Sequence, residues 1–90
     1  MMPLNYAILL HFTKVERASA DDVIATLAPQ YGRFRGLRRP AVVEALMTAE
    51  KNGLLEEAGY DLDAAGALRV YYRASAESRA AIKRYIGPER

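Results

Sequence analysis

The chain contains no cysteine among its 90 residues and only one histidine, His11. The lack of cysteine excludes a disulfide framework, thiol chemistry and a metal site built from thiolates. A single histidine excludes a histidine-rich metal site within one chain. The longest apolar run, Tyr6–Leu10, is far shorter than the roughly 20 residues that a membrane-spanning helix needs. The N-terminus lacks the charged start and the long apolar stretch of a secretory signal, so we expect a cytoplasmic protein with no membrane partner.

Motifs of the common enzyme classes are also absent. The chain has no P-loop, no glycine pattern of a dinucleotide-binding fold and no nucleophile-elbow serine. His11 has no acid, thiol or second histidine near it in the pattern to orient it, so we interpret it as a partly buried polar residue. We therefore predict a protein that is not an enzyme and that uses no cofactor and no metal.

The charge of the chain is distributed unevenly. Residues 1–40 carry six basic and three acidic side chains, residues 41–68 carry Lys51 against six acids, and residues 69–90 carry six basic and two acidic side chains. The formal net charge of +2 therefore conceals two basic arms around an acidic centre. An anionic partner would suit only part of such a surface. The length leaves room for one domain, which we place at residues 1–90.

Four helices are predicted from apolar spacing and from residues typical of helix ends. Ser19, with Asp22 three residues later, indicates an N-cap, and Ser75 indicates a second. Pro29 is expected to end the second helix, because the residue before a proline disfavours helical geometry. Gly53 is expected to follow the third helix in the left-handed conformation. The predicted ranges are Leu4–Thr13, Ala20–Ala28, Pro40–Lys51 and Ala76–Ile86, and the last helix is expected to pack Ala81, Ile82, Tyr85 and Ile86 inward.

Two alternating segments, Glu56–Leu62 and Leu68–Ala74, predict a β-hairpin around a turn at residues 63–66. The register with apolar side chains on one face pairs Leu62 with Leu68, Tyr60 with Val70 and Ala58 with Tyr72. On the other face it pairs Asp61 with Arg69, Gly59 with Tyr71 and Glu57 with Arg73. Both charged pairs have opposite signs, so we expect the two arginines to be neutralised across the hairpin. The fold class predicted from these elements is α+β and mostly helical.

The segment from Ala45 to Glu56 resembles the recognition helix and first wing strand of a winged helix-turn-helix protein. The resemblance lies in a leucine, an apolar residue three positions on, an acid, and a glycine followed by two apolar residues. Leu46, Ala49, Glu50, Gly53, Leu54 and Leu55 fill these positions. Residues 68–77 resemble the second wing strand entering a C-terminal helix, as in the MarR-like and PadR-like regulators. The resemblance implies a winged helix, with a three-helix bundle, a hairpin wing and a C-terminal helix.

The same resemblance implies a transcriptional regulator that binds double-stranded DNA as a homodimer, with the third helix in the major groove. Four arginines within seven residues precede that helix, and guanidinium groups suit both phosphates and guanine edges. The positive end of the helix dipole at this terminus also favours phosphate. The predicted DNA-binding residues are Arg33, Arg35, Arg38, Arg39, Thr48 and Lys51.

Each part of this set has an alternative interpretation. The arginines could belong to a mobile, solvated loop and pair with Glu44 or Asp21. Thr48 and Lys51 equally suit a plain solvated helix face. The basic residues of the last helix are interpreted as a solvated surface; they are Arg79, Lys83, Arg84 and Arg90.

Two aromatic residues, Tyr31 and Phe34, interleave with the arginines. We expect one of them to anchor the loop in the core, because of the apolar area that an aromatic ring brings. The alternative is that they stack on bases, as in proteins that bind single strands, and residues 32–36 would then bind single-stranded RNA.

The acidic centre supports a second functional hypothesis from another class. Residues 41–68 cover the third helix and the hairpin, and their net charge is negative. The chain would then be a protein-protein interaction module that uses its acidic third helix and wing to bind a basic protein partner.

Overall fold

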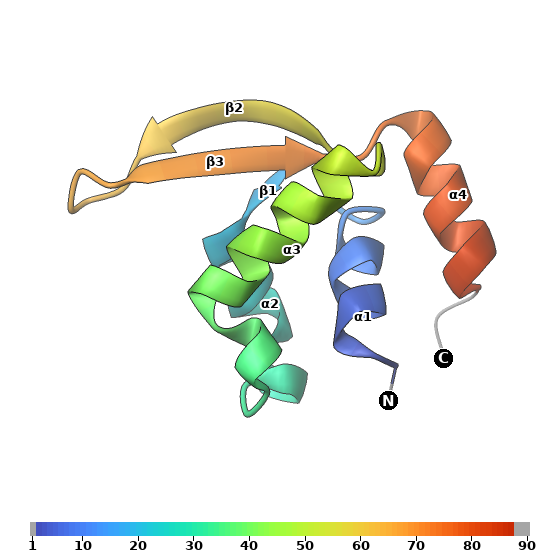
Figure 1. Cartoon of the computed structure of the whole chain (residues 1–90), viewed down its shortest axis with the longest axis horizontal. Helices are drawn as coiled ribbons and strands as arrows, with labels where there is room; N and C mark the ends of the chain where they lie inside the picture. Colours follow the sequence, from blue (N-terminus) through green and yellow to red (C-terminus); the bar gives the residue numbers. More distant parts are fainter. Residues whose placement is uncertain (1, 88–90) are drawn as a thin grey trace.

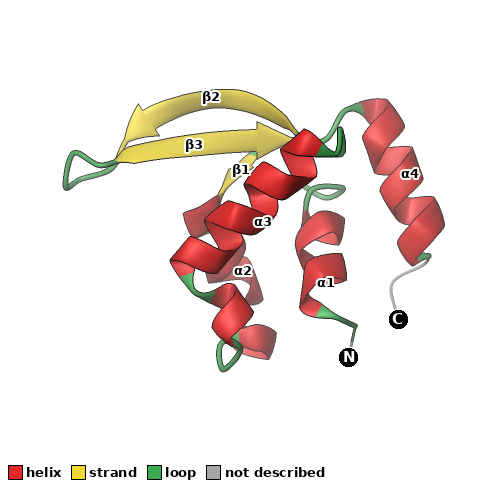
Figure 2. Ribbon diagram, in the orientation of Figure 1, coloured by secondary structure: helices red, strands yellow, loops and turns green. Residues whose placement is uncertain are grey.

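A computed structural model describes residues 2–87, which form four α-helices and a three-stranded antiparallel sheet. The sheet has the order β1-β3-β2, and its hairpin extends to one side beyond the helices (Figures 1 and 2). The predicted α+β class is therefore confirmed. The elements are α1 (Leu4–His11), β1 (Ala18–Ser19), α2 (Ala20–Tyr31), the 3-10 helix η1 (Arg35–Leu37), α3 (Arg39–Lys51), β2 (Glu56–Leu62), β3 (Leu68–Arg73) and α4 (Ala76–Ile86).

The helix ends predicted at Ser19, Ser75 and Gly53 are confirmed. The Ser19 side chain accepts a hydrogen bond from the backbone N–H of Asp22, and the Asp22 carboxylate accepts one from the backbone N–H of Ser19. The Ser75 hydroxyl caps α4 by accepting a hydrogen bond from the backbone N–H of Ser78, and Gly53 takes a φ of +79° after α3. Each of these arrangements depends on neighbours a few residues apart, so a sequence pattern is enough to predict it. The first helix ends at His11, two residues before the predicted Thr13.

The prediction that Pro29 ends the second helix is wrong, because α2 continues to Tyr31. A proline inside a helix loses one backbone hydrogen bond and crowds the preceding turn. Tyr31 is only 1% exposed, and its hydroxyl donates a hydrogen bond to the carbonyl of Met2. Burial of this ring offsets the cost of Pro29, and the backbone N–H of Gly32 still reaches the carbonyl of Ala28 at 2.9 Å.

The hairpin register is confirmed near the turn and wrong near the base. The pairs Leu62–Leu68, Asp61–Arg69 and Tyr60–Val70 form as predicted, but Glu57 pairs with Tyr72 and Glu56 pairs with Arg73. The register shifts between Glu57 and Tyr60, which is a β-bulge, and Gly59 there has a φ of +110° that side chains rarely adopt. Strand β1 was not predicted, because two residues are too few to show an alternating pattern; it pairs Ala18 with Tyr72 and Ser19 with Tyr71.

One hydrophobic core joins the helices to the sheet within the described residues. Its side chains with at most 2% exposure include Phe12, Val23, Tyr31, Val42, Leu46, Ala74 and Ile82. Tyr85 was expected to pack inward from the last helix, but it is 86% exposed, so that part of the prediction is wrong. No helix between residues 2 and 87 has the length and apolar character needed to cross a membrane.

Candidate nucleic-acid interface

The arginine segment, residues 33–39, is anchored to the core by buried residues before it and within it. Tyr31 precedes it and Leu37 lies within it, and both are buried in the core. Gly36 lies against α1, where an added Cβ would come within 2.8 Å of Cδ2 of Leu4, so a larger residue would require the Leu4 side chain to shift. The stretch between the second and third predicted helices is partly helical, as the end of α2, as η1 and as the start of α3. The backbone carrying the arginines is held by packing on either side.

Three of the four arginines in this segment are exposed and have no acidic partner. Arg33, Arg35 and Arg38 make no hydrogen bond or ion pair through their side chains among residues 2–87. Arg39 differs, because its Nε lies 3.2 Å from Oδ1 of Asp21. The alternative of pairing with Asp21 therefore holds for Arg39 alone. No ion pair with Glu44 is found in the described part of the chain.

The two aromatic residues of this region separate into one buried and one exposed ring. Tyr31 is the anchor that was expected, since its ring is in the core. Phe34 is 45% exposed and packs its ring on that of Tyr31 with 5.4 Å between the ring centroids. In the sequence, Arg33 and Arg35 flank this partly exposed aromatic residue.

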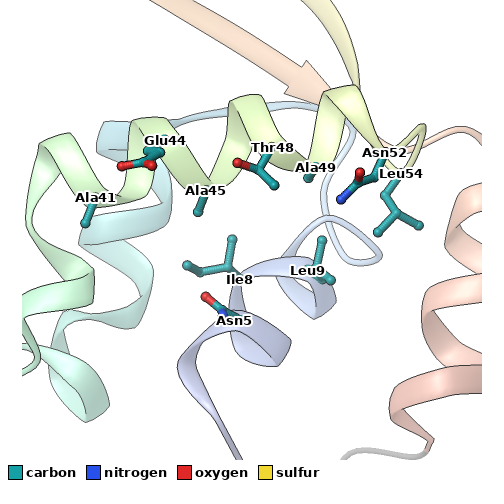
Figure 3. A pocket seen from close by; sticks show the side chains of 10 residues that line it. All are labelled: Asn5, Ile8, Leu9, Ala41, Glu44, Ala45, Thr48, Ala49, Asn52 and Leu54. Atoms are coloured by element: carbon teal, nitrogen blue, oxygen red, sulfur yellow. The ribbon is translucent and has the colours of Figure 1, made fainter.

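Thr48 and Lys51 are not brought next to the arginines. They follow Arg39 by nine and twelve residues, which corresponds to about 14 and 18 Å along a helix axis. Thr48 lines a groove of about 420 Å³ between α1 and α3, where Ala45 and Ile8 face one another (Figure 3). Both predicted residues are exposed, as expected, but they lie on a different stretch of the molecular surface.

The arginines of the hairpin are neutralised, as predicted. Nε of Arg69 donates to Asp61 at 2.7 Å, and this hydrogen bond is the largest cause that holds the pKa of Asp61 below its usual range. Arg73 pairs with Glu56, not with the predicted Glu57, because the β-bulge shifts the register by one residue. The sign of each pair could be predicted from alternation, but the identity of the second partner could not.

Arg17 joins Asp61, Arg69 and Tyr71 in a cluster on the outer face of the hairpin, and the sequence analysis did not predict this. Its guanidinium carbon lies 4.2 Å from the centroid of the Tyr71 ring, and its Nη1 donates to the carbonyl of Ala58 at 3.1 Å. The Tyr71 hydroxyl in turn donates to Asp61 at 3.0 Å. No local pattern in the sequence links Arg17 to a carbonyl 41 residues away.

Arg79 does not belong to a solvated basic surface, which corrects the interpretation of the last helix. Its Nε donates to the carbonyl of Ala74 at 2.9 Å, and its Nη2 donates to the carbonyl of Val15 at 2.8 Å. Lys83 and Arg84 are exposed, as expected. Arg90 lies outside the described residues.

His11 is buried, and its Nε2 atom has no hydrogen-bond partner among residues 2–87. Desolvation by burial lowers its pKa below 6.5; Asp22 opposes this shift and Lys14 adds to it. No group of three or more His, Asp or Glu side chains between residues 2 and 87 is placed to hold a metal ion.

This burial predicts how stability depends on pH. Because the folded-state pKa lies below 6.5, the unfolded chain binds the proton first as the pH falls. The free energy of unfolding is therefore expected to be highest above pH 6.5 and to decrease as the pH falls through the window below it. Urea unfolding followed by circular dichroism at several pH values measures this. Since His11 is the sole histidine, the variant His11→Phe should lose the dependence in this window just below pH 6.5. Equal pH slopes in both chains would contradict the assignment.

No family model matches the chain, and neither a curated protein nor a solved structure was found that is similar to it.

Proposed function

We propose that the chain is a winged helix protein that binds double-stranded DNA through its arginine segment and acts as a small transcriptional regulator. The observation that carries the proposal is the exposure of Arg33, Arg35 and Arg38 without an acidic partner among residues 2–87. Guanidinium groups in such a cluster suit phosphate oxygens. Five other arginines are by contrast held by carboxylates, carbonyls or an aromatic ring; they are Arg17, Arg39, Arg69, Arg73 and Arg79. Arg84 on α4 is exposed as well, but no second arginine lies next to it in the sequence.

The arrangement of the elements supports this proposal. A third helix followed by an antiparallel hairpin and a last helix is compatible with a winged helix, the family that the sequence resembles. The arginine segment lies at the N-terminus of α3, where the helix dipole favours phosphate. A homodimer would present two such segments to two half-sites of a duplex.

The charges along α3 suggest which end of the helix meets DNA. Exposed Glu44 and Glu50 would repel phosphates along its outer surface, whereas Arg38 and Arg39 lie at its first turn. We therefore place the duplex at the N-terminal end of α3, with Arg39 shared between DNA and Asp21. Thr48 and Lys51 would contribute only at the margin of this interface.

A salt titration tests the proposal. The affinity of the chain for a fluorescent duplex is measured by anisotropy between about 50 and 200 mM salt, where counterion release gives a log–log slope of about −0.9 for each phosphate contact. Arg33→Ala with Arg35→Ala is expected to make that slope shallower by about 1.8, because two contacts are lost.

The matched control is Lys83→Ala with Arg84→Ala, which removes the same charge from exposed positions on α4. This control should keep the slope of the unaltered chain. The proposal fails if no duplex binds at the lowest salt concentration, or if both double variants change the slope equally.

A further inference from the structure

A second surface of the molecule combines exposed apolar side chains with acids. A cleft of about 400 Å³ runs between α3 and the inner face of the hairpin, which is the face that carries the buried Tyr72. Val43 and Met47 line it from α3, and Leu68 and Val70 line it from β3. Two arginines, Arg39 and Arg69, also line it, and each is paired with an aspartate. We call this surface the α3–hairpin cleft.

The apolar lining of the α3–hairpin cleft continues onto the open part of the hairpin. Met47 is 55% exposed and Leu68 is 57% exposed. The pairs Leu62–Leu68 and Tyr60–Val70 place two further exposed apolar side chains on this same face. Contiguous exposed apolar surface of this kind marks a site of interaction with another molecule.

Two carboxylates stand beside this apolar surface. Glu50 lies on α3. The β-bulge pairs Glu57 with Tyr72, where Ala58 was expected, and so brings Glu57 to the cleft. Neither carboxylate has a hydrogen bond or ion pair among residues 2–87. Burial raises the pKa of Tyr72, which lines the cleft, and the negative charges of Glu50 and Glu57 raise it further. Both acids are therefore close enough to Tyr72 to interact with it electrostatically.

We propose that the α3–hairpin cleft binds an amphipathic helical segment of a partner protein, with apolar side chains in the cleft and Lys or Arg beside Glu50 and Glu57. An apolar groove that receives one face of a helix is a recurrent mode of peptide recognition, and opposite charges at its rim set the specificity. This inference goes beyond DNA binding, because the apolar side chains and acids of the cleft carry it, and the cleft shares only Arg39 with the arginine segment.

The acids argue against a DNA duplex in the cleft. A duplex would bring phosphates toward Glu50 and Glu57, where charges of the same sign repel. A second copy docked by twofold symmetry would set Glu50 and Glu57 beside the same acids or beside Arg39 and Arg69 of the other copy, because such an interface pairs one patch with itself. The oligomeric state of the variants below distinguishes this occupant from a partner peptide. A partner segment that is both basic and apolar would cover the exposed apolar side chains and would pair its cations with the two carboxylates.

Synthetic peptides of stated sequence pattern provide the probe. Two capped peptides of about 14 residues, roughly four helical turns, share one leucine stripe. They differ only at the positions outside this stripe, which are Lys in one peptide and Glu in the other. We expect the full chain to bind the Lys peptide at least about tenfold more tightly than the Glu peptide. Chemical shift changes in nuclear magnetic resonance spectra should centre on Val43, Met47, Leu68 and Val70.

Charge reversals locate the site. Glu50→Lys with Glu57→Lys is expected to weaken binding of the Lys peptide about tenfold. The control, Glu16→Lys with Glu44→Lys, changes the net charge equally at exposed positions outside the cleft and should leave the affinity within about twofold. Loss of affinity in the control instead would place the peptide elsewhere, for example in the groove between α1 and α3, and would overturn the proposal.

The apolar contribution is tested in parallel. Met47→Ser with Leu68→Ser should weaken the Lys peptide strongly, whereas Tyr6→Ser with Tyr85→Ser, which also alters exposed side chains, should not. Thermal unfolding of each variant shows that it is folded. The proposal is overturned if the Glu peptide binds equally well, or if the two serine replacements in the cleft turn a dimeric chain into a monomer. The duplex titration is independent of all these outcomes.

Discussion

Phe12→Ala is expected to lower the free energy of unfolding by about 3–5 kcal/mol. The Phe12 side chain is fully buried and lies where the chain leaves α1, with its ring against that of His11 at 5.6 Å between centroids. Truncation removes this contact and leaves a cavity in the core that joins the helices to the sheet. A small domain has a total stability of about 5–15 kcal/mol, so the variant should lose a large part of it.

The chain supplies its own control, because it contains just one other phenylalanine. Phe34 is 45% exposed and contacts Tyr31 through its ring edge, so Phe34→Ala should cost only about 1 kcal/mol. Urea unfolding followed by circular dichroism measures both losses. Similar losses in the two variants would contradict the positions assigned to these rings.

Arg79→Ala is expected to destabilise the chain by about 2 kcal/mol, although the residue lies on a helix with an exposed, basic side. Its guanidinium joins α4 to two carbonyls, those of Ala74 and Val15, and hydrogen bonds from a charged donor each contribute about 1.5–3 kcal/mol. Water reaches part of the site after truncation, which keeps the loss below the sum of the two bonds.

Arg84→Ala is the matched control for this second prediction. It removes the same charge from the same helix, but Arg84 is exposed, so the change should stay within about 0.5 kcal/mol. Arg79→Lys should remain destabilised, because an ammonium group cannot reproduce the planar fork that reaches both carbonyls. Full stability in Arg79→Ala would show that the two hydrogen bonds contribute nothing.

Arg79 and the arginine segment together show why a count of basic residues is a poor guide to an interface. Arginines that look equivalent in the sequence have different partners in space: Arg79 holds backbone carbonyls, Arg69 and Arg73 hold carboxylates, and Arg17 stacks on Tyr71. The candidate interface therefore narrows from the four predicted arginines to three, Arg33, Arg35 and Arg38, with Arg39 partly engaged by Asp21.

The sequence by itself determined the features that depend on close neighbours. The capping box of Ser19 and Asp22, the cap of Ser75 and the left-handed Gly53 all form within a few residues of chain, so their patterns predicted them correctly. The hairpin pairs nearest the turn were also predictable, because a short turn determines which residues oppose each other there.

Only the tertiary structure decided the features in which distant residues compete with local preference. The burial of Tyr31 carries α2 past Pro29, and the bulge at Gly59 brings Glu57 into the α3–hairpin cleft. Arg17 likewise finds its carbonyl 41 residues away. Local preferences amount to at most a few kcal/mol, and burial of one large side chain is of the same size. Contacts between distant residues can therefore overrule a pattern that is correct for the isolated segment.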